Sequence, residues 1–329
     1  MRCTPSGRNS RRSELRILVR IADGKMNSNS TDKRIELRKT LGGTRPPERI
    51  TQDAFERDEG HLGRMVRLEA NARPTPDDLF DYLQDLRYTE IQTSLFVYLL
   101  PVLLQAWRND VLRIDASNAG TIENLYPVLA QRGIFSEHLT AKQTAVVVDF
   151  MRRTILEEID EQRGLQFRGS GVRAYRWIRE VMTYGVLLPD VEVLWREWWS
   201  ARTVGRAVAA IQFISCLMYS DYENPVFAPW TGDEGGGPPS LWEFEGHLYE
   251  NRWLEPNVKF LAATLNVESV KQLLLQAVDR LRGEAEHSVA ASVIEDFALC
   301  EETIATRCDA LPKLLATRQT AGNRFEWPE

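Results

Sequence analysis

The chain is poor in cysteine, and its four cysteines have no spacing typical of a metal site. They are Cys3, Cys216, Cys300 and Cys308, and no C-x-x-C pair occurs among them. Structural zinc sites take ligands from such pairs, so we expect none of that kind. If Cys300 and Cys308 share one helix, they lie roughly 12 Å apart along its axis, too far for a disulfide. We therefore expect free thiols in a reducing compartment.

Long apolar runs are missing as well. The longest, 95–104 and 207–219, are shorter than the about 18 residues that a membrane-spanning helix needs. Arg11 and Arg12 superficially suggest a twin-arginine export signal, but charged residues interrupt the apolar segment that should follow them. We expect a cytoplasmic protein, of bacterial type, with no membrane contact.

Charge is abundant but unevenly distributed. Residues 1–50 contain thirteen Lys/Arg and five Asp/Glu. Subtracting these from the 41 basic and 47 acidic residues of the whole chain leaves 28 and 42 in residues 51–329, a net charge of −14. An acidic body repels phosphate backbones, so we do not expect nucleic acid as a partner.

The N-terminal region has little that could build a core. Residues 1–74 are polar and rich in arginine, and Gly42-Gly43 and Pro46-Pro47 interrupt them. We predict a disordered basic arm over 1–74, with translation starting at Met1 or at Met26. The second domain is then a helical one, residues 75–329.

Helical signals begin at Thr75, which can cap a helix whose first position is Pro76. Thr140 and Thr203 are further predicted caps. Residues 91–107 are apolar on nearly every side and predict a buried helix that Pro101 kinks or divides. The remaining predicted helices cover 140–164, 172–184, 191–199, 204–219, 258–265, 270–281 and 289–308.

The helix after Thr140 has two distinct faces. Its apolar stripe consists of Val148, Met151, Ile155 and Ile159, and the opposite polar face consists of Asp149, Arg152, Arg153, Glu157 and Asp160. Strand-like alternation does not recur along the chain, and no repeat of 30 to 50 residues is found. We predict an all-α fold, an irregular multi-helix bundle with a long loop over 221–256.

Residues 79–160 combine the sequence FVYLLP at 96–101, Phe135, TAKQ at 140–143 and VVDFM at 147–151. This combination resembles a widespread family of uncharacterised bacterial proteins, in which an aromatic Leu-Pro helix precedes a Phe/Thr–Gln segment. The resemblance covers about a quarter of the chain and implies a helical fold, with no known activity. Met151 stands where that pattern would have leucine.

Seven of the nine tryptophans lie between Trp177 and Trp253. Trp195, Trp198 and Trp199 fall at i, i+3 and i+4 and predict one aromatic helix face, which we interpret as core. Loop tryptophans are harder to bury, and carboxylates and one histidine surround them. The predicted binding residues of this loop are Trp230, Trp242, Trp253, Asp233, Glu234, Glu245 and His247.

A second, weaker site is predicted ahead of the helix at 172–184. Backbone N–H groups and guanidinium groups there could hold an anion, although an ordinary turn between helices remains the alternative. Its residues are Arg168, Gly169, Ser170, Gly171 and Arg173.

These patterns favour a protein–protein interaction module that uses an aromatic and acidic surface around residues 195–253 to bind another protein. The alternative is a hydrolase or transferase with a carboxylate/histidine site in 221–256, with or without a metal. The sequence contains no motif for a metal or a cofactor, and we expect none. The identity of the partner and the oligomeric state stay open.

Overall fold

The computed structural model describes residues 37–42, 45–52, 62–63, 66, 75–112, 121–165, 176–219, 226 and 252–317. Within these ranges every regular element is a helix, which confirms the predicted all-α class. The elements are α3 (Pro76–Tyr88), α4 (Thr93–Val111), α5 (Thr121–Gln131), the π-helix η2 (Ile134–His138), α6 (Ala141–Asp160), α7 (Arg176–Leu187), α8 (Val191–Trp198), α9 (Val204–Met218), α10 (Glu255–Thr264), α11 (Val267–Arg280), α12 (His287–Asp296), the 3-10 helix η3 (Phe297–Leu299) and α13 (Glu301–Ala316).

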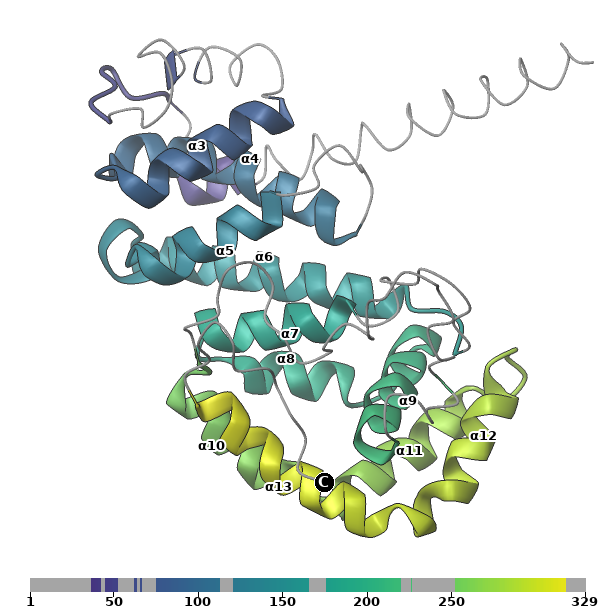
Figure 1. Ribbon diagram of the computed structural model, residues 1–329. Helices are drawn as coiled ribbons and strands as arrows, with labels where there is room; N and C mark the ends of the chain where they lie inside the picture. Colours follow the sequence, from purple (N-terminus) through teal and green to yellow (C-terminus); the bar gives the residue numbers. More distant parts are fainter. Residues whose placement is uncertain are drawn as a thin grey trace, which may run out of the picture.

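The helices are stacked in successive layers (Figure 1). The layers run from α3 and α4 through α5 and α6, then α7 and α8, to α10 and α13, while α9, α11 and α12 lie to one side. Helix α6 is near the middle of this stack, where it packs against α4, α7, α8 and α9.

The three predicted caps are confirmed. The hydroxyl of Thr75 accepts from the backbone N–H of Asp78, that of Thr140 from Gln143, and that of Thr203 from Arg206. The first two are capping boxes, because the third helical residue also accepts from the backbone N–H of the cap. These local bonds fix the starts of α3, α6 and α9.

Two predicted helices differ from the observed ones. Pro101 does not divide α4, which continues to Val111 with almost all of its side chains buried. Because α5 and α6 both pack on α4, tertiary contacts hold the two halves together despite the N–H that proline lacks. The predicted helix 289–308 is instead two helices joined by η3, a turn that buries Phe297 and leaves Leu299 exposed.

The prediction of a disordered arm over 1–74 is wrong for its described parts. Leu37, Leu41 and Leu62 are buried in the same core as the helices of the body. Their apolar side chains find partners because long-range packing overrides the polar composition around them. The described part of the folded body therefore starts at residue 37, within the predicted arm.

The aromatic face of α8 lies in the core, as predicted. The ring centroid of Trp198 is 5.0 Å from that of Trp177 and 5.0 Å from that of Trp195, with the rings edge to face. Phe213 of α9 closes the cluster at 5.5 Å from Trp198. Trp195 and Trp198 are buried and Trp199 is partly buried. This geometry is favourable for aromatic pairs and makes α8 a packing element.

Candidate functional site

Trp253 is the one residue of the predicted binding set that the structure describes, and it is not on the surface. Its side chain is 2% exposed, and its indole N–H donates to the backbone oxygen of Met182 at 2.8 Å. The prediction is wrong because the chain returns to α7 before α10 begins: the N–H of Leu254 donates to the backbone oxygen of Gly185 at 3.1 Å. A Cβ on Gly185 would lie 2.3 Å from the ring of Trp253.

The other predicted site residues lie outside the described residues. From the loop these are Trp230, Trp242, Asp233, Glu234, Glu245 and His247. From the predicted anion site they are Arg168, Gly169, Ser170, Gly171 and Arg173. Both sites, and the enzyme alternative that depends on the loop, stay predictions.

The described part of the chain contains no group of three or more His, Cys, Asp or Glu side chains placed to hold a metal. None of its helices is long and apolar enough to cross a membrane.

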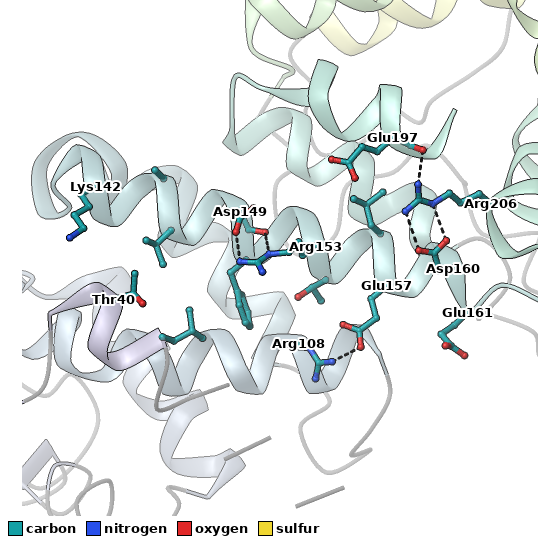
Figure 2. Close-up of a pocket in the computed structure, with 16 residues that line it drawn as sticks. Thr40, Arg108, Lys142, Asp149, Arg153, Glu157, Asp160, Glu161, Glu197 and Arg206 are labelled. Atoms are coloured by element: carbon teal, nitrogen blue, oxygen red, sulfur yellow. Dashed lines mark hydrogen bonds and ion pairs between the residues drawn. The ribbon is translucent and has the colours of Figure 1, made fainter. Parts of the chain in front are cut away.

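A groove follows one face of α6 over its whole length (Figure 2). Its volume is about 760 Å³. The lining residues recur at three- and four-residue intervals, the spacing of a single helix face. From α6 and its C-cap they are Lys142, Ala145, Val146, Asp149, Phe150, Arg153, Thr154, Leu156, Glu157, Asp160 and Glu161.

The walls of the groove come from four distant parts of the chain. Leu37 and Thr40 belong to the short helical segment at 37–41, Arg108 to the end of α4, Glu197 to α8 and Arg206 to α9. Figure 2 shows Thr40 and Lys142 near one end of the groove and Glu197 and Arg206 near the other. Only the folded chain assembles this set.

Ion pairs hold the charged walls in place. The guanidinium of Arg206 binds both carboxylate oxygens of Asp160, at 2.9 and 3.1 Å, and donates to the backbone oxygen of Glu197 at 2.8 Å. Arg108 pairs with Glu157 at 2.5 Å. Asp149 pairs with Arg153 and, at 2.7 Å, with Arg152. A two-pronged pair such as Arg206–Asp160 fixes side-chain orientation, because the planar guanidinium matches a carboxylate.

Two charged side chains at opposite ends of the groove do not take part in these ion pairs. Within the part of the chain that the structure describes, the ammonium of Lys142 and the carboxylate of Glu161 make no ion pair. Nineteen residues separate them, or about 28 Å along a helix axis. The helix dipole has the same polarity, positive at the Lys142 end and negative at the Glu161 end. The groove is therefore electrically polar along its length.

The floor of the groove is apolar near its middle. Phe150 and Leu156 are nearly buried, Val146 is partly buried, and Ala145 is exposed. The ring of Phe150 is backed by Trp107 of α4, with centroids 6.4 Å apart. An occupant would thus meet a rigid apolar floor between charged walls.

Ion pairs fix most of the charges in the lining. Its side chains include no histidine and no cysteine, and its carboxylates at 149, 157 and 160 are already paired with arginines. The groove presents fixed charges and an apolar floor.

A second polar group is fully enclosed. The indole N–H of Trp107 donates to the hydroxyl of Tyr126 at 2.8 Å, and that hydroxyl donates to the carboxylate of Glu180. All three side chains are at most 1% exposed, so no substrate can reach them. They join α4, α5 and α7 and act as a structural connection.

The α6 groove had a visible signal in the sequence, namely the polar face at Asp149, Arg153, Glu157 and Asp160. The sequence predicted only a polar face there, because no neighbouring residue indicates that Leu37, Thr40, Glu197 and Arg206 would lie beside it. Comparisons with protein-family models, curated proteins and solved structures give no match to the chain, so the resemblance of residues 79–160 to a bacterial family stays a prediction.

Proposed function

We propose that this protein binds a segment of another polypeptide, and that the groove along α6 is its docking surface. The observation that carries the proposal is the groove itself: one continuous face of a five-turn helix, with walls from four other parts of the chain, is open over about 760 Å³. Binding grooves for partner segments have this form, with an apolar floor and a few placed charges.

Protein–protein interaction was also the function predicted from the sequence, but the binding surface proposed here is the α6 groove and not the region 195–253. Trp195, Trp198 and Trp253 are buried, so they are not available as aromatic contacts. The polar face of α6 takes their place, because its side chains line a concave surface and are held by ion pairs.

Charge complementarity defines the occupant. A basic side chain is expected beside Glu161, where the C-terminal end of α6 adds negative potential. An acidic side chain is expected beside Lys142 at the other end. An apolar side chain between them would cover Phe150. An extended segment that spans about 28 Å has about eight residues.

The test uses peptides selected from a random displayed library of twelve-residue sequences against the full chain. We expect the selected peptides to share an apolar position between a basic and an acidic one, in either order, since the groove fixes the spacing of these side chains and not the direction of the peptide chain. Ala145→Trp places a large ring in the groove at an exposed position and should abolish their binding. The matched control is Ala263→Trp, at an exposed position of α10.

Charge reversal sharpens the experiment. Glu161→Lys should weaken binding of a selected peptide about tenfold, and exchanging the basic residue of the peptide for glutamate should restore it. Peptides that bind the Ala145→Trp and Ala263→Trp variants equally well would show that the groove is not the docking surface.

A further inference from the structure

One wall of the groove belongs to a segment whose backbone is bonded by two glutamine side chains of the body. The guanidinium of Arg38, in the same segment, also lies over the ring of Tyr98 in α4, 4.9 Å from its centroid. We define this segment, residues 37–42 and 45–52, as the strap. The amide of Gln92, at the start of α4, makes bonds in both directions: its Oε1 accepts from the N–H of Thr51 at 2.7 Å and its Nε2 donates to the backbone oxygen of Arg49 at 2.8 Å. The side chain of Gln52 accepts in turn from the N–H of Gln92 at 3.3 Å.

The second fastening is at the start of α6. The Nε2 of Gln143 donates to the backbone oxygen of Leu41 at 2.7 Å. The Oε1 of the same side chain accepts from the N–H of Thr140 at 2.9 Å and completes the capping box. One glutamine thus caps α6 with its oxygen and holds the strap with its nitrogen.

The apolar anchorage of the strap is small. Leu37 and Leu41 are buried and Ile50 is partly buried, but most other residues of the strap are exposed. By contrast, α4 beneath it is buried along almost its whole length. Segments with few buried apolar contacts open at a lower free energy than the core does.

We infer that the strap is a movable wall of the α6 groove, which opens while the body stays folded and is held shut by an occupant. Leu37 and Thr40 line the groove, so a bound segment touches the strap only when the strap is docked. A ligand that binds the docked form alone must stabilise that form. The inference that the strap opens depends only on its contacts with the body. The inference that a bound segment holds the strap closed rests on the proposed function.

The opening is tested by hydrogen exchange on the free full-length protein. Gln143→Glu keeps the oxygen that caps α6, since glutamate is also favoured there, and removes the N–H₂ donor to Leu41. We expect amides of the strap to exchange at least tenfold faster, with those of α4 and α6 unchanged within twofold. Gln92→Ala should do the same, because that side chain does not cap α4.

The control is Gln276→Glu, the same chemical change on an exposed turn of α11. It should leave the strap unaffected. Equal acceleration in the strap, α4 and α6 would show that the strap unfolds only with the body and would overturn the inference. Unchanged exchange in both strap variants would overturn it as well.

The coupling is tested with a selected peptide at about one hundred times its Kd. Strap amides should then exchange at least tenfold more slowly than in the free protein. If the strap opens in the free protein but the bound peptide does not slow its exchange, the coupling is wrong while the groove remains a binding site. If no peptide is selected, the proposed function fails, and the result of Gln143→Glu still decides whether the strap opens.

Discussion

Helices α6 and α9 pack against each other, yet they differ in what surrounds them. Helix α9 is buried on nearly every side and has an apolar, alanine-rich sequence. Helix α6 buries one face and gives the other to a groove with charged walls. A helix buried all round supports the fold and leaves no face for a ligand, whereas a two-faced helix inside a layered stack can do both. If this division holds, substitutions on the side of α9 should affect stability most.

The largest effect is expected at Trp198, which packs on Phe213 of α9. Trp198→Ala should lower the free energy of unfolding by about 3–5 kcal/mol, because a fully buried indole is replaced by a cavity. Chemical denaturation measures the loss. Trp199→Ala, at a partly buried ring, should cost clearly less; equal costs would contradict the assignment of Trp198 to the centre of the cluster.

The next effect is expected where the two helices meet. A Cβ on Gly205 would lie 2.1 Å from the backbone oxygen of Asp160, which cannot move without disturbing the end of α6. Gly205→Ala should therefore destabilise the protein by about 1–3 kcal/mol, although alanine is the better helix former. Thermal melting reads the change. A more stable variant would mean that α6 and α9 do not approach this closely.

A smaller effect is expected at high pH, at Tyr184 of α7. Burial and the nearby carboxylate of Asp190, to which the hydroxyl donates, raise the pKa of Tyr184 above its ordinary value. The unfolded chain releases this proton first, near pH 10, so stability held below pH 10 is lost as the pH rises further. The slope for this group should rise through the ordinary tyrosine pKa and approach about 1.4 kcal/mol per pH unit above it.

Tyr184→Phe should lessen the loss of stability in denaturation experiments between pH 9 and 11 (about one pH unit to either side of the ordinary tyrosine pKa). Part of the loss should remain, because burial also raises the pKa of Tyr82 and Tyr219. Tyr88→Phe, at an exposed ring, is the matched control and should leave the loss unchanged. A loss of stability in Tyr184→Phe as large as in the unchanged protein would contradict a raised pKa at Tyr184.

The smallest effect on stability is expected on the groove side. Arg153 is largely exposed and pairs with Asp149 one turn away on the same helix. Arg153→Ala should change the free energy of unfolding by less than about 1 kcal/mol, as is usual for exposed ion pairs. It should still weaken the binding of a selected peptide, because the side chain lines the groove. A large loss of stability would make this face structural.

The sequence predicted those features that depend on neighbours in the chain. Thr75, Thr140 and Thr203 cap helices through bonds to residues three positions away, so their pattern can be recognised locally. The periodicity of Trp195 and Trp198 likewise predicted a core face. Trp253 could not be placed in this way, because its burial depends on Met182 and Gly185, about seventy positions earlier in the chain.

The groove, like the burial of Trp253, depends on residues that are distant in the chain. The polar face of α6 was visible as a pattern, but its walls come from residues 37–40, 108, 197 and 206. No local rule brings these segments together; the packing of α6 on α4, α8 and α9 does. For the same reason composition alone suggested an arm up to residue 74, whereas Leu37, Leu41 and Leu62 reach the core.

The most direct test of the central claim, that a polypeptide segment lies along the groove of α6, is site-specific photo-crosslinking. A benzophenone side chain replaces Ala145 in the groove or, as a control, Ala263 on α10. A selected peptide should crosslink at position 145 through its central apolar residue and should not crosslink at position 263. Crosslinking at 263 with none at 145 would contradict the account.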